Sequence, residues 1–399
     1  MWEDSTLMRV KTPGIAIAQG PRGPRRLWPL AALVAAGTVL PGTAGVASAG
    51  VHDSAYRQVN LRSDIPGLAA VTDPDLVNSW GVSASAGTDQ VPGGALWVSD
   101  NGKDKTTLYT SGTATTVSKA GLIVTITSGA PTGQVSNSDT NPNDFVVHDA
   151  AGHSGPAAFI FVSENGGIDG WNPGVGVAAG ANPPSTVTEV AHNKGANAVY
   201  KGLAQAQASD GKTYLYATNF RSGRVEVYNS DFKPAELPGG RFADRRLPAG
   251  YAPFDIAEFA GKLYVTYAKQ DAGREDDVAG PGHGFVDVFT TDGKLIRRLV
   301  TRGALNSPWG LALAPDNFGR FSGALLVGNF GDGRINAYNP DTGAHLGQLR
   351  GANGHPIAIE GLWSLRFGNG NAAKTNELIF SSGPDHETHG LLGKLVLAS

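Results

Sequence analysis

One supersecondary unit is repeated six times along the chain, at a spacing of about 50–60 residues. Each copy has an apolar segment opened by a small, polar or proline residue, followed by two short strands around a polar turn. The copies start near residues 78, 143, 200, 253, 307 and 360. Copies three and five share Asn-Phe-x-x-Gly-Arg, at residues 219–224 and 329–334. Repeats of this size cannot bury their apolar faces alone, so the copies must pack against one another.

The segments within each copy have the character of β-strands. They are short, rich in Val, Leu, Tyr and Phe, and separated by turn formers such as Asn101-Gly102 and Asp292-Gly293. After residue 49, no stretch shows a sustained helical period of apolar residues bounded by caps. We therefore predict an all-β fold, a six-bladed β-propeller with four short antiparallel strands in each blade.

A propeller must close its ring, because an open blade would leave strand edges and apolar faces in water. The sixth copy has only three strands and ends near Leu397. Residues 56–62 precede the first copy and resemble an outer strand such as residues 295–300. We predict that residues 56–62 supply the missing strand of the last blade.

The first 49 residues have the features of an export signal. An apolar run over residues 27–40 follows Arg25 and Arg26 and precedes Ala47-Ser48-Ala49, a pattern that signal peptidase accepts. The run contains Pro29 and is shorter than the roughly twenty residues that span a bilayer. The paired arginines suit either Sec or twin-arginine export. We expect a secreted monomer without a membrane span after cleavage, with residues 50–399 forming one propeller domain.

Composition removes several classes of function. The chain has no cysteine, which excludes disulfides, thiolate metal sites and a cysteine nucleophile. A hydrophobic content of 41% excludes simple disorder, and glycines that cluster between apolar runs exclude collagen. The formal net charge of −3 argues against a nucleic-acid partner, which needs a concentrated basic surface.

Two resemblances emerge from these motifs. Residues 308–312 (Pro-Trp-Gly-Leu-Ala) and 326–338 resemble the blades of NHL and SMP-30/strictosidine-synthase-like six-bladed propellers. Residues 56–64, 78–82, 97–102 and 382–393 are similar to an uncharacterised family of exported bacterial propeller proteins. The broader group implies a ligand or metal site at one end of the central channel. Its calcium-dependent lactonases imply a cation held by Glu, Asn and Asp residues from different blades.

Propeller topology places two sets of residues at the same end of the channel. One set opens each inner strand, and the other lies in the turn between the second and third strands. Singly, such residues most often serve turn structure. The ligand-face candidates are Asn78, Asp100, Glu164, Lys201, Asn219, Arg221, Asn329, Asp332, Asp385 and Glu387.

Oxygen-bearing residues that converge from several blades would suit Ca²⁺, which prefers six to eight oxygen ligands. By the resemblance to the lactonases, the candidate ligands are Asn143, Asp144, Asp255 and Glu360. One central Asn position of that pattern is occupied by Lys201, whose ammonium would repel a cation.

Three histidines are candidates for catalysis or metal binding. His386 and His389 lie in Asp-His-Glu-Thr-His, which has donors that Zn²⁺ or Cu²⁺ accept but lacks the helical His-Glu-x-x-His spacing. A hydrogen-bonded structural turn is the alternative. His283 follows the longest departure from the repeat, residues 270–282, whose charged run is either a binding loop or a solvated surface.

Other active-site motifs are absent. The sequence has no Gly-x-Ser-x-Gly elbow, Walker loop or dinucleotide-binding motif. The tryptophans at 80, 97, 171, 309 and 363 fit an inter-blade core better than a sugar platform. Two functions therefore remain open. The first is binding of a small molecule, glycan or peptide at the channel mouth, and the second is a metal-supported hydrolase of the lactonase or phosphotriesterase kind.

Overall fold

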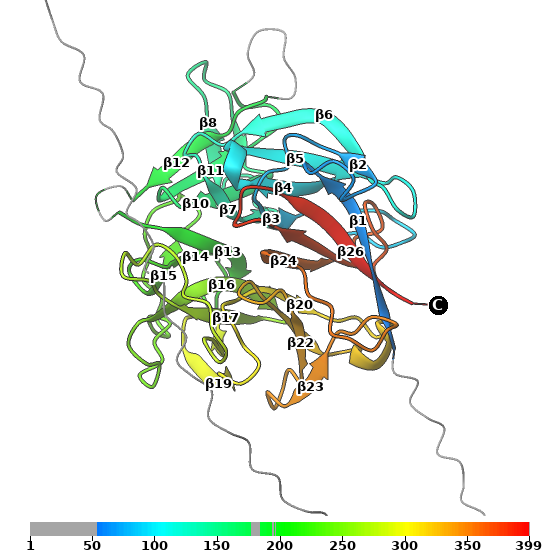
Figure 1. The fold of residues 1–399 in the computed structure, drawn as a ribbon. Helices are drawn as coiled ribbons and strands as arrows, with labels where there is room; N and C mark the ends of the chain where they lie inside the picture. The colour runs from blue at the N-terminus through cyan, green and yellow to red at the C-terminus, as the bar shows by residue number, and fades with distance from the viewer. Residues whose placement is uncertain (1–53, 177–183, 194, 196, 399) are drawn as a thin grey trace, which may run out of the picture. The chain divides into compact units, whose positions relative to one another are not determined.

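The computed structural model describes residues 54–176, 184–193, 195 and 197–398. Six sheets of three to five strands lie around a central axis, and a seventh sheet has only two strands (Figure 1). The predicted export signal lies outside the described residues. The six larger sheets are the blades of a six-bladed β-propeller, so the fold predicted from the repeats is confirmed. Within the described residues, helix is limited to short 3-10 turns such as η1 (Asn101–Lys103) and η3 (Gly319–Phe321).

The blades follow one another in chain order, each running from an inner strand at the axis to an outer strand (Figure 1). Blade 1 contains β3 (Ser79–Ser83), β4 (Leu96–Asp100), β5 (Lys105–Thr110) and β6 (Ser118–Thr125). Blade 2 contains β7 (Pro131–Ser136), β10 (Phe159–Ser163), β11 (Gly167–Trp171) and β12 (Thr188–His192). Blade 3 contains β13 (Tyr200–Gln207), β14 (Thr213–Asn219) and β15 (Arg224–Tyr228). Blade 4 contains β16 (Tyr251–Phe259), β17 (Lys262–Lys269), β18 (Phe285–Thr290) and β19 (Leu295–Thr301). Blade 5 contains β20 (Pro308–Leu313), β21 (Leu325–Asn329), β22 (Ile335–Tyr338) and β23 (His345–Gln348). Blade 6 contains β24 (Leu362–Phe367), β25 (Leu378–Ser382), β26 (Leu391–Leu397), β1 (Tyr56–Ser63) and β2 (Val71–Thr72).

The second blade does not start near residue 143, as the repeat spacing suggested. Its inner strand is β7, which begins at Pro131 and pairs with β10. Residues 143–148 lie in an insertion, where β8 (Val146–His148) and β9 (Ser154–Pro156) form a separate two-stranded sheet. The apolar segment Phe145 to Val147 packs instead in a core cluster shared by blades 2 and 3, and this explains its strand-like composition.

The closing strand lies where the sequence predicts it. β1 pairs antiparallel with β26, from Tyr56 opposite Leu397 to Ser63 opposite Leu391. Tyr56 also donates a backbone hydrogen bond to the carbonyl of Arg350 at 2.8 Å, and its hydroxyl donates to the carbonyl of Phe318 at 2.9 Å. The amino-terminal strand therefore completes blade 6 and ties it to blade 5.

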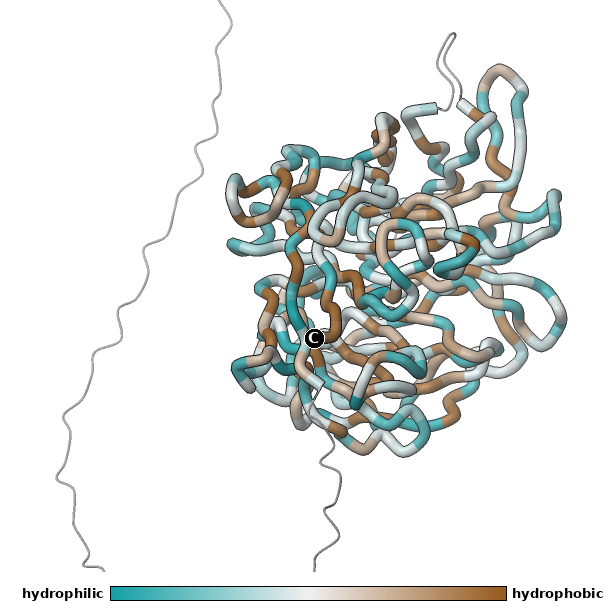
Figure 2. Tube along the Cα trace, turned by 90° about the vertical axis from the view of Figure 1, so that its right-hand side faces the viewer, coloured by the Kyte–Doolittle hydropathy of each residue, from teal (hydrophilic) through white to brown (hydrophobic). Residues whose placement is uncertain are grey.

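The cores lie between neighbouring blades, because both faces of each twisted sheet are covered. Figure 2 shows short hydrophobic and hydrophilic stretches alternating along the chain. Trp97 and Trp171 belong to one such inter-blade cluster, as expected from the sequence. Trp97 stacks on Phe159 and lies tilted against Trp171, with ring centroids 4.2 and 4.8 Å away.

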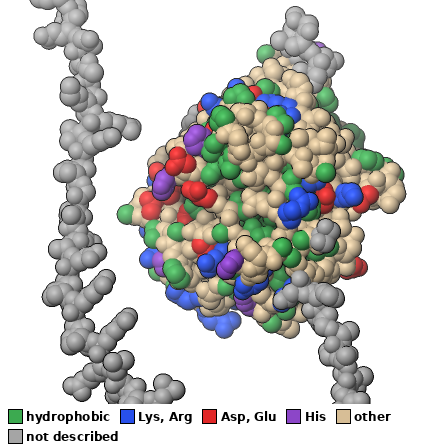
Figure 3. Space-filling view, turned by 45° about the vertical axis from the view of Figure 1, so that its right-hand side comes forward, with side chains coloured by type: hydrophobic (Ala, Val, Ile, Leu, Met, Phe, Trp, Pro, Cys, Tyr) green, Lys and Arg blue, Asp and Glu red, His purple; other side chains and the backbone are tan. Residues whose placement is uncertain are grey.

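Acidic, basic and histidine side chains are interspersed with uncharged surface on the face shown in Figure 3, and acidic groups gather in one area at the left of that view. Among the residues that the structure describes, no helix has the length and apolar character needed to cross a membrane.

Candidate functional site

One side chain near the start of each inner strand occupies an equivalent position in its blade. In each of these strands the pairing with the next strand slips at this position, for example between Ser79 and Val82 of β3. A bulge of this kind redirects the side chains at the slip. The residues at this position are Trp80, Thr132, Lys201, Phe254, Trp309 and Trp363.

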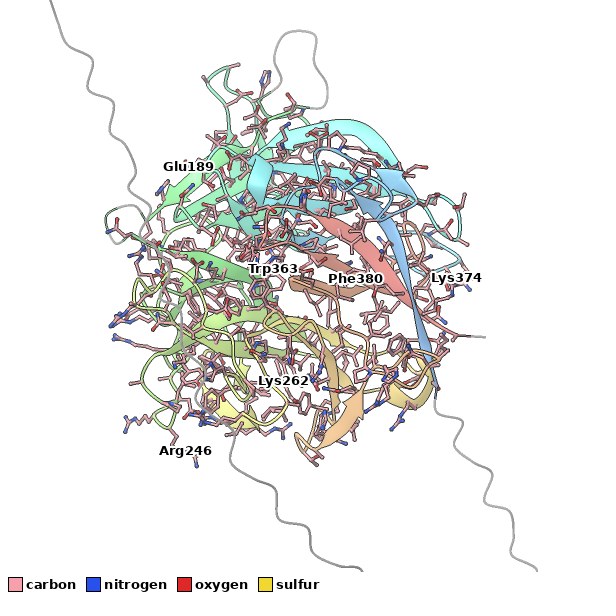
Figure 4. The ribbon with its side chains drawn as sticks, viewed as in Figure 1. Glu189, Arg246, Lys262, Trp363, Lys374 and Phe380 are labelled. Atoms are coloured by element: carbon pink, nitrogen blue, oxygen red, sulfur yellow. The ribbon has the colours of Figure 1, made fainter. Side chains whose placement is uncertain are left out.

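The aromatic members close the central channel. Trp80 and Trp363 stack with ring centroids 3.5 Å apart, and Trp309 meets them edge-on at 6.1 and 5.8 Å. Phe254 and Phe330 pack against Trp363 at 5.9 and 4.0 Å. Figure 4 shows Trp363 in the middle of the ring of inner strands. These residues form an aromatic plug, so Trp80, Trp309 and Trp363 are not part of the inter-blade cores assigned to them from the sequence.

The ammonium group of Lys201 lies at the centre of the mouth, against the aromatic plug. Its side chain is only 2% exposed, and Nζ lies 5.0 Å from the centroid of the Trp80 ring. Lys201 forms an ion pair with Glu164 of the β10–β11 turn and a second one, at 3.3 Å, with Asp276 of the β17–β18 loop. Blades 2, 3 and 4 therefore meet at a single ammonium group.

Asn78 joins this charged group to the plug. Its Oδ1 accepts hydrogen bonds from the indole N–H groups of Trp80 at 2.9 Å and Trp363 at 3.1 Å. Its Nδ2 donates to Glu387 Oε2 at 2.9 Å and to Asn101 Oδ1 at 3.2 Å. Asn101 in turn donates to Glu164 Oε2 at 3.0 Å. The hydrogen bonds therefore run without a break from blade 6 through blade 1 to blade 2.

Glu387 reaches this network from an unusual turn. Asp385, His386 and Glu387 have φ values of 52°, 54° and 65°, three consecutive non-glycine residues in the left-handed region. Such residues cost roughly 1–2 kcal/mol each, and strained backbone of this kind is concentrated at functional sites. The N–H of Asp385 donates to Glu360 Oε1 at 3.1 Å, which helps to hold the turn.

The long β17–β18 loop folds over the mouth. Asp276 reaches Lys201, and Glu275 forms an ion pair with Arg221 of the β14–β15 turn. The N–H of Gly280 donates to Asn306 Oδ1 at 2.6 Å, which fixes the far end of the loop to blade 5. The charged run in this loop is therefore partly engaged at the mouth, and Asp276 is the residue that makes the central contact.

The charges at the mouth shift one another's pKa values. Burial alone would lower the pKa of Lys201, but the nearby carboxylates of Glu164 and Asp276 outweigh it, and the pKa is raised. Burial raises the pKa of Glu387, against the lowering effect of its hydrogen bond from Asn78. Lys201 therefore stays positively charged. The carboxylates of Glu164 and Asp276 contact it directly, and Glu387 adds a third carboxyl group that is hydrogen-bonded to the neighbouring Asn78.

The four residues suggested as calcium ligands are not brought together. Asn143 is exposed in the β7–β8 insertion beside Asp144, and Glu360 is exposed and bonded to the turn at Asp385. Asp255 lines a cavity of about 450 Å³ in the channel, where burial raises its pKa well above the usual range. Among the described residues, no group of three or more His, Asp and Glu side chains is placed to hold a metal ion. At the mouth itself, Lys201 Nζ occupies the space between the carboxylates, and this donor set does not fit a cation.

The remaining ligand-face candidates have structural partners. Asp100 is fully buried inside blade 1, where Thr107 donates to it at 2.8 Å and burial raises its pKa. Asn219 bridges its own turn and Glu226, and Asn329 donates to Asp332 at 3.0 Å. Of the ten candidates, Asn78, Glu164, Lys201 and Glu387 are the ones that meet at the mouth, and Arg221 secures the loop that covers it.

The three histidines do not converge. His389 Nδ1 lies 2.8 Å from Asp64 Oδ2, and this hydrogen bond raises the pKa of His389. His283 Nδ1 donates to the carbonyl of Val278 within its own loop at 2.7 Å. His386 is exposed on the strained turn. For His389, the hydrogen bond to Asp64 matches the alternative of a hydrogen-bonded structural turn.

Two groups at the mouth were missed by reasoning from the sequence. The sequence did not single out Asp276 within residues 270–282, a run left open between a binding loop and a solvated surface. Thr132 was missed because the second blade was expected to start near residue 143. A signal for Thr132 exists in the sequence, since Pro131-Thr-Gly matches Ser79-Trp-Gly and Pro308-Trp-Gly. No local pattern marks Asp276, because its role depends on where the loop folds.

The chain is similar to two uncharacterized proteins of Acanthamoeba polyphaga mimivirus. The first is 31% identical over 343 residues, covering 84% of this chain and 78% of the viral protein. The second is 30% identical over 341 residues, covering 82% of each. These relatives are viral, and not the bacterial proteins that the motifs led us to expect. No protein-family model matches the chain.

Solved structures with a similar fold are more distant. A proposed gluconolactonase is 18% identical, with a TM-score of 0.38, over 60% of this chain and 73% of that one. A PQQ-bound aldose sugar dehydrogenase from Streptomyces coelicolor is 13% identical, with a TM-score of 0.45, over 86% of this chain and 99% of that one. At these values the likenesses do not bear on the activity of this chain.

Proposed function

The chain belongs to the same family as the two mimivirus proteins, and we propose that it is an exported binding protein that takes a small, donor-rich ligand at the mouth of its propeller. The supporting observation is the convergence of four blades on Lys201 and its surrounding carboxylates. Export is inferred from the sequence of residues 1–49 alone.

The chemistry of the mouth indicates the class of ligand. Glu164, Asp276 and Glu387 supply carboxylate oxygens, and one ammonium group cannot satisfy them all. A ligand with several hydroxyl or ammonium groups would fill the unused acceptor sites. A ligand carboxylate would instead be repelled by this surplus of negative charge. Sugars and amino sugars carry the required donors.

A metal-supported hydrolase is less well supported by the same geometry. The carboxylates and amides of such a site are present, but the ammonium of Lys201 lies between them. The site as built is suited to recognition without a bound cation.

The proposal is tested by titrating the purified protein with glucose, glucosamine and gluconate, three probes of similar size but different charge, using isothermal titration calorimetry. We expect glucosamine to bind at least as tightly as glucose, and gluconate to bind least. The variant Glu387→Gln should weaken binding of glucosamine by about tenfold, because one charge-assisted hydrogen bond is lost. The variant Asp231→Asn, far out in blade 3 with a side chain 63% exposed, is the matched control. A preference for gluconate, or equal affinities in wild type and Glu387→Gln, would contradict the proposal.

A further inference from the structure

Among the residues that the structure describes, blade 3 has three strands and no fourth. Its sheet consists of β13, β14 and β15, whereas each of the other five blades has four or five strands. β15 is therefore the outermost strand, and it lies at the periphery of the propeller at the left of Figure 1. Unpaired strand edges are sites where another chain can add a strand.

The chain that follows β15 covers only one end of its edge. The N–H of Ala235 donates to the carbonyl of Val227 at 2.8 Å, and Pro234 bridges Tyr228. Beyond Ala235, the chain leaves the edge and forms an opposite wall, held by Phe242 packing on Tyr216 at 5.6 Å. The space between the wall and the strand is a groove rather than a fourth strand.

This groove runs along the whole of β15. Its volume is about 960 Å³, near the upper end of the range for ligand pockets, and every residue from 223 to 228 lines it. The side chains of Val225, Leu237, Phe242 and Tyr267 give it an apolar lining. An extended peptide could place alternate side chains on this lining.

The backbone of β15 offers the hydrogen bonds that such a peptide needs. Backbone groups along a strand alternate in direction, so the outward carbonyl of Val227 implies that the N–H and C=O of Val225 also face outward. Within the described residues, no backbone hydrogen bond joins Val225 to a segment beyond its own sheet. The middle of the edge is therefore free to pair.

The rim of the groove is basic. Arg224, Arg241 and Arg245 line it and are exposed. Its acidic residues are mostly engaged. Glu226 accepts hydrogen bonds from Tyr200 and Asn219, and Asp244 is 2% exposed and paired with Arg298. Glu236, 85% exposed, is the acidic lining residue that remains on the surface, and it pairs with Arg241.

We infer that this groove binds an extended acidic peptide, which adds as the fourth strand of blade 3. The partner pairs with the backbone at Val225, places alternate apolar side chains on the lining and directs its carboxylates to the arginine rim. This site is separate from the mouth, and the inference does not depend on the proposed function.

The test is fluorescence anisotropy with a labelled octapeptide of alternating valine and glutamate, combined with hydrogen exchange of the protein. We expect saturable binding that weakens with salt, and slower exchange at the Val225 amide when the peptide is bound. The double variant Arg224→Glu/Arg241→Glu should weaken binding by at least about tenfold. Arg246→Glu, exposed on the same loop but outside the groove, is the matched control and should leave binding unchanged.

A second peptide separates strand addition from simple charge attraction. Replacing the valines by proline keeps the charge but removes backbone donors, and this peptide should not bind. The inference is overturned if the valine peptide fails to bind at about 1 mM, if both peptides bind equally, or if the Val225 amide is already protected in the free protein. Binding of a sulfated oligosaccharide with no binding of the peptide would also overturn it and indicate a polyanion site.

Discussion

At the scale of single residues, one position in each inner strand determines which side chain the blade places at the channel axis. The same bulged backbone carries a tryptophan in blades 1, 5 and 6 and a lysine in blade 3. The tryptophans close the channel below the mouth, and Lys201 adds the positive charge that pairs with the carboxylates of Glu164 and Asp276. The mouth of this propeller therefore differs by one side chain, Lys201, from a site in which every ligand atom is oxygen.

Buried carboxyl groups give the fold a pH dependence that can be measured at one residue. Asp169 in β11 has one buried oxygen without a partner, and burial raises its pKa to about 6. The folded state then binds the proton more tightly than the unfolded state, whose pKa is about 3.9. The contribution of Asp169 to stability is therefore favourable at low pH and falls as the pH rises from about 4 to about 6, by about 3 kcal/mol.

We expect Asp169→Asn to remove this dependence. Urea titrations at about pH 4.5 and pH 7.5 give the unfolding free energy of wild type and variant. Relative to wild type, the variant should be more stable at pH 7.5 than at pH 4.5. Asp231→Asn, whose side chain is 63% exposed, should show no such shift. A difference that stays constant with pH, or moves the other way, would contradict the assignment.

At the scale of elements, the closing strand provides the clearest test. Leu61 of β1 is 1% exposed in the core between blades 6 and 1, whereas Arg57 on the same strand is exposed. Leu61→Ala should lower the free energy of unfolding by about 2–5 kcal/mol, and Arg57→Ala by no more than about 0.5 kcal/mol. Thermal or urea unfolding measures both. Equal, small effects would mean that β1 does not hold the ring closed.

The elements also show how far a sequence can be read. Alternating strands and turn formers predicted the all-β fold, and the three-strand last copy predicted the role of β1, because both depend on local patterns. The start of blade 2 was wrong because Phe145-Val-Val is an apolar segment in an insertion, and its burial gives it the same composition as an inner strand. The apolar composition of a strand indicates that it is buried, but it does not indicate whether the strand is the inner strand of a blade.

At the scale of the whole molecule, the mouth is produced by ring closure. Glu387 comes from blade 6, Asn78 from blade 1, Glu164 from blade 2, Lys201 from blade 3 and Asp276 from blade 4. Topology was enough to predict that Asn78, Glu164, Lys201 and Glu387 share one end of the channel. It could not predict which of the other polar residues at that end turn inward, because this depends on side-chain contacts such as those that engage Asp100 and Asn329.

The central claim is that the ammonium of Lys201 occupies the place of a cation among carboxylates from several blades. Its most direct test is terbium luminescence, sensitised by the neighbouring tryptophans, in wild type, Lys201→Asn and the control Lys212→Asn, whose side chain is 75% exposed. Replacing the ammonium with an amide oxygen should create a binding site that calcium displaces, while wild type and control remain dark at the same concentration. Equal calcium-sensitive luminescence in wild type and Lys201→Asn would contradict the account.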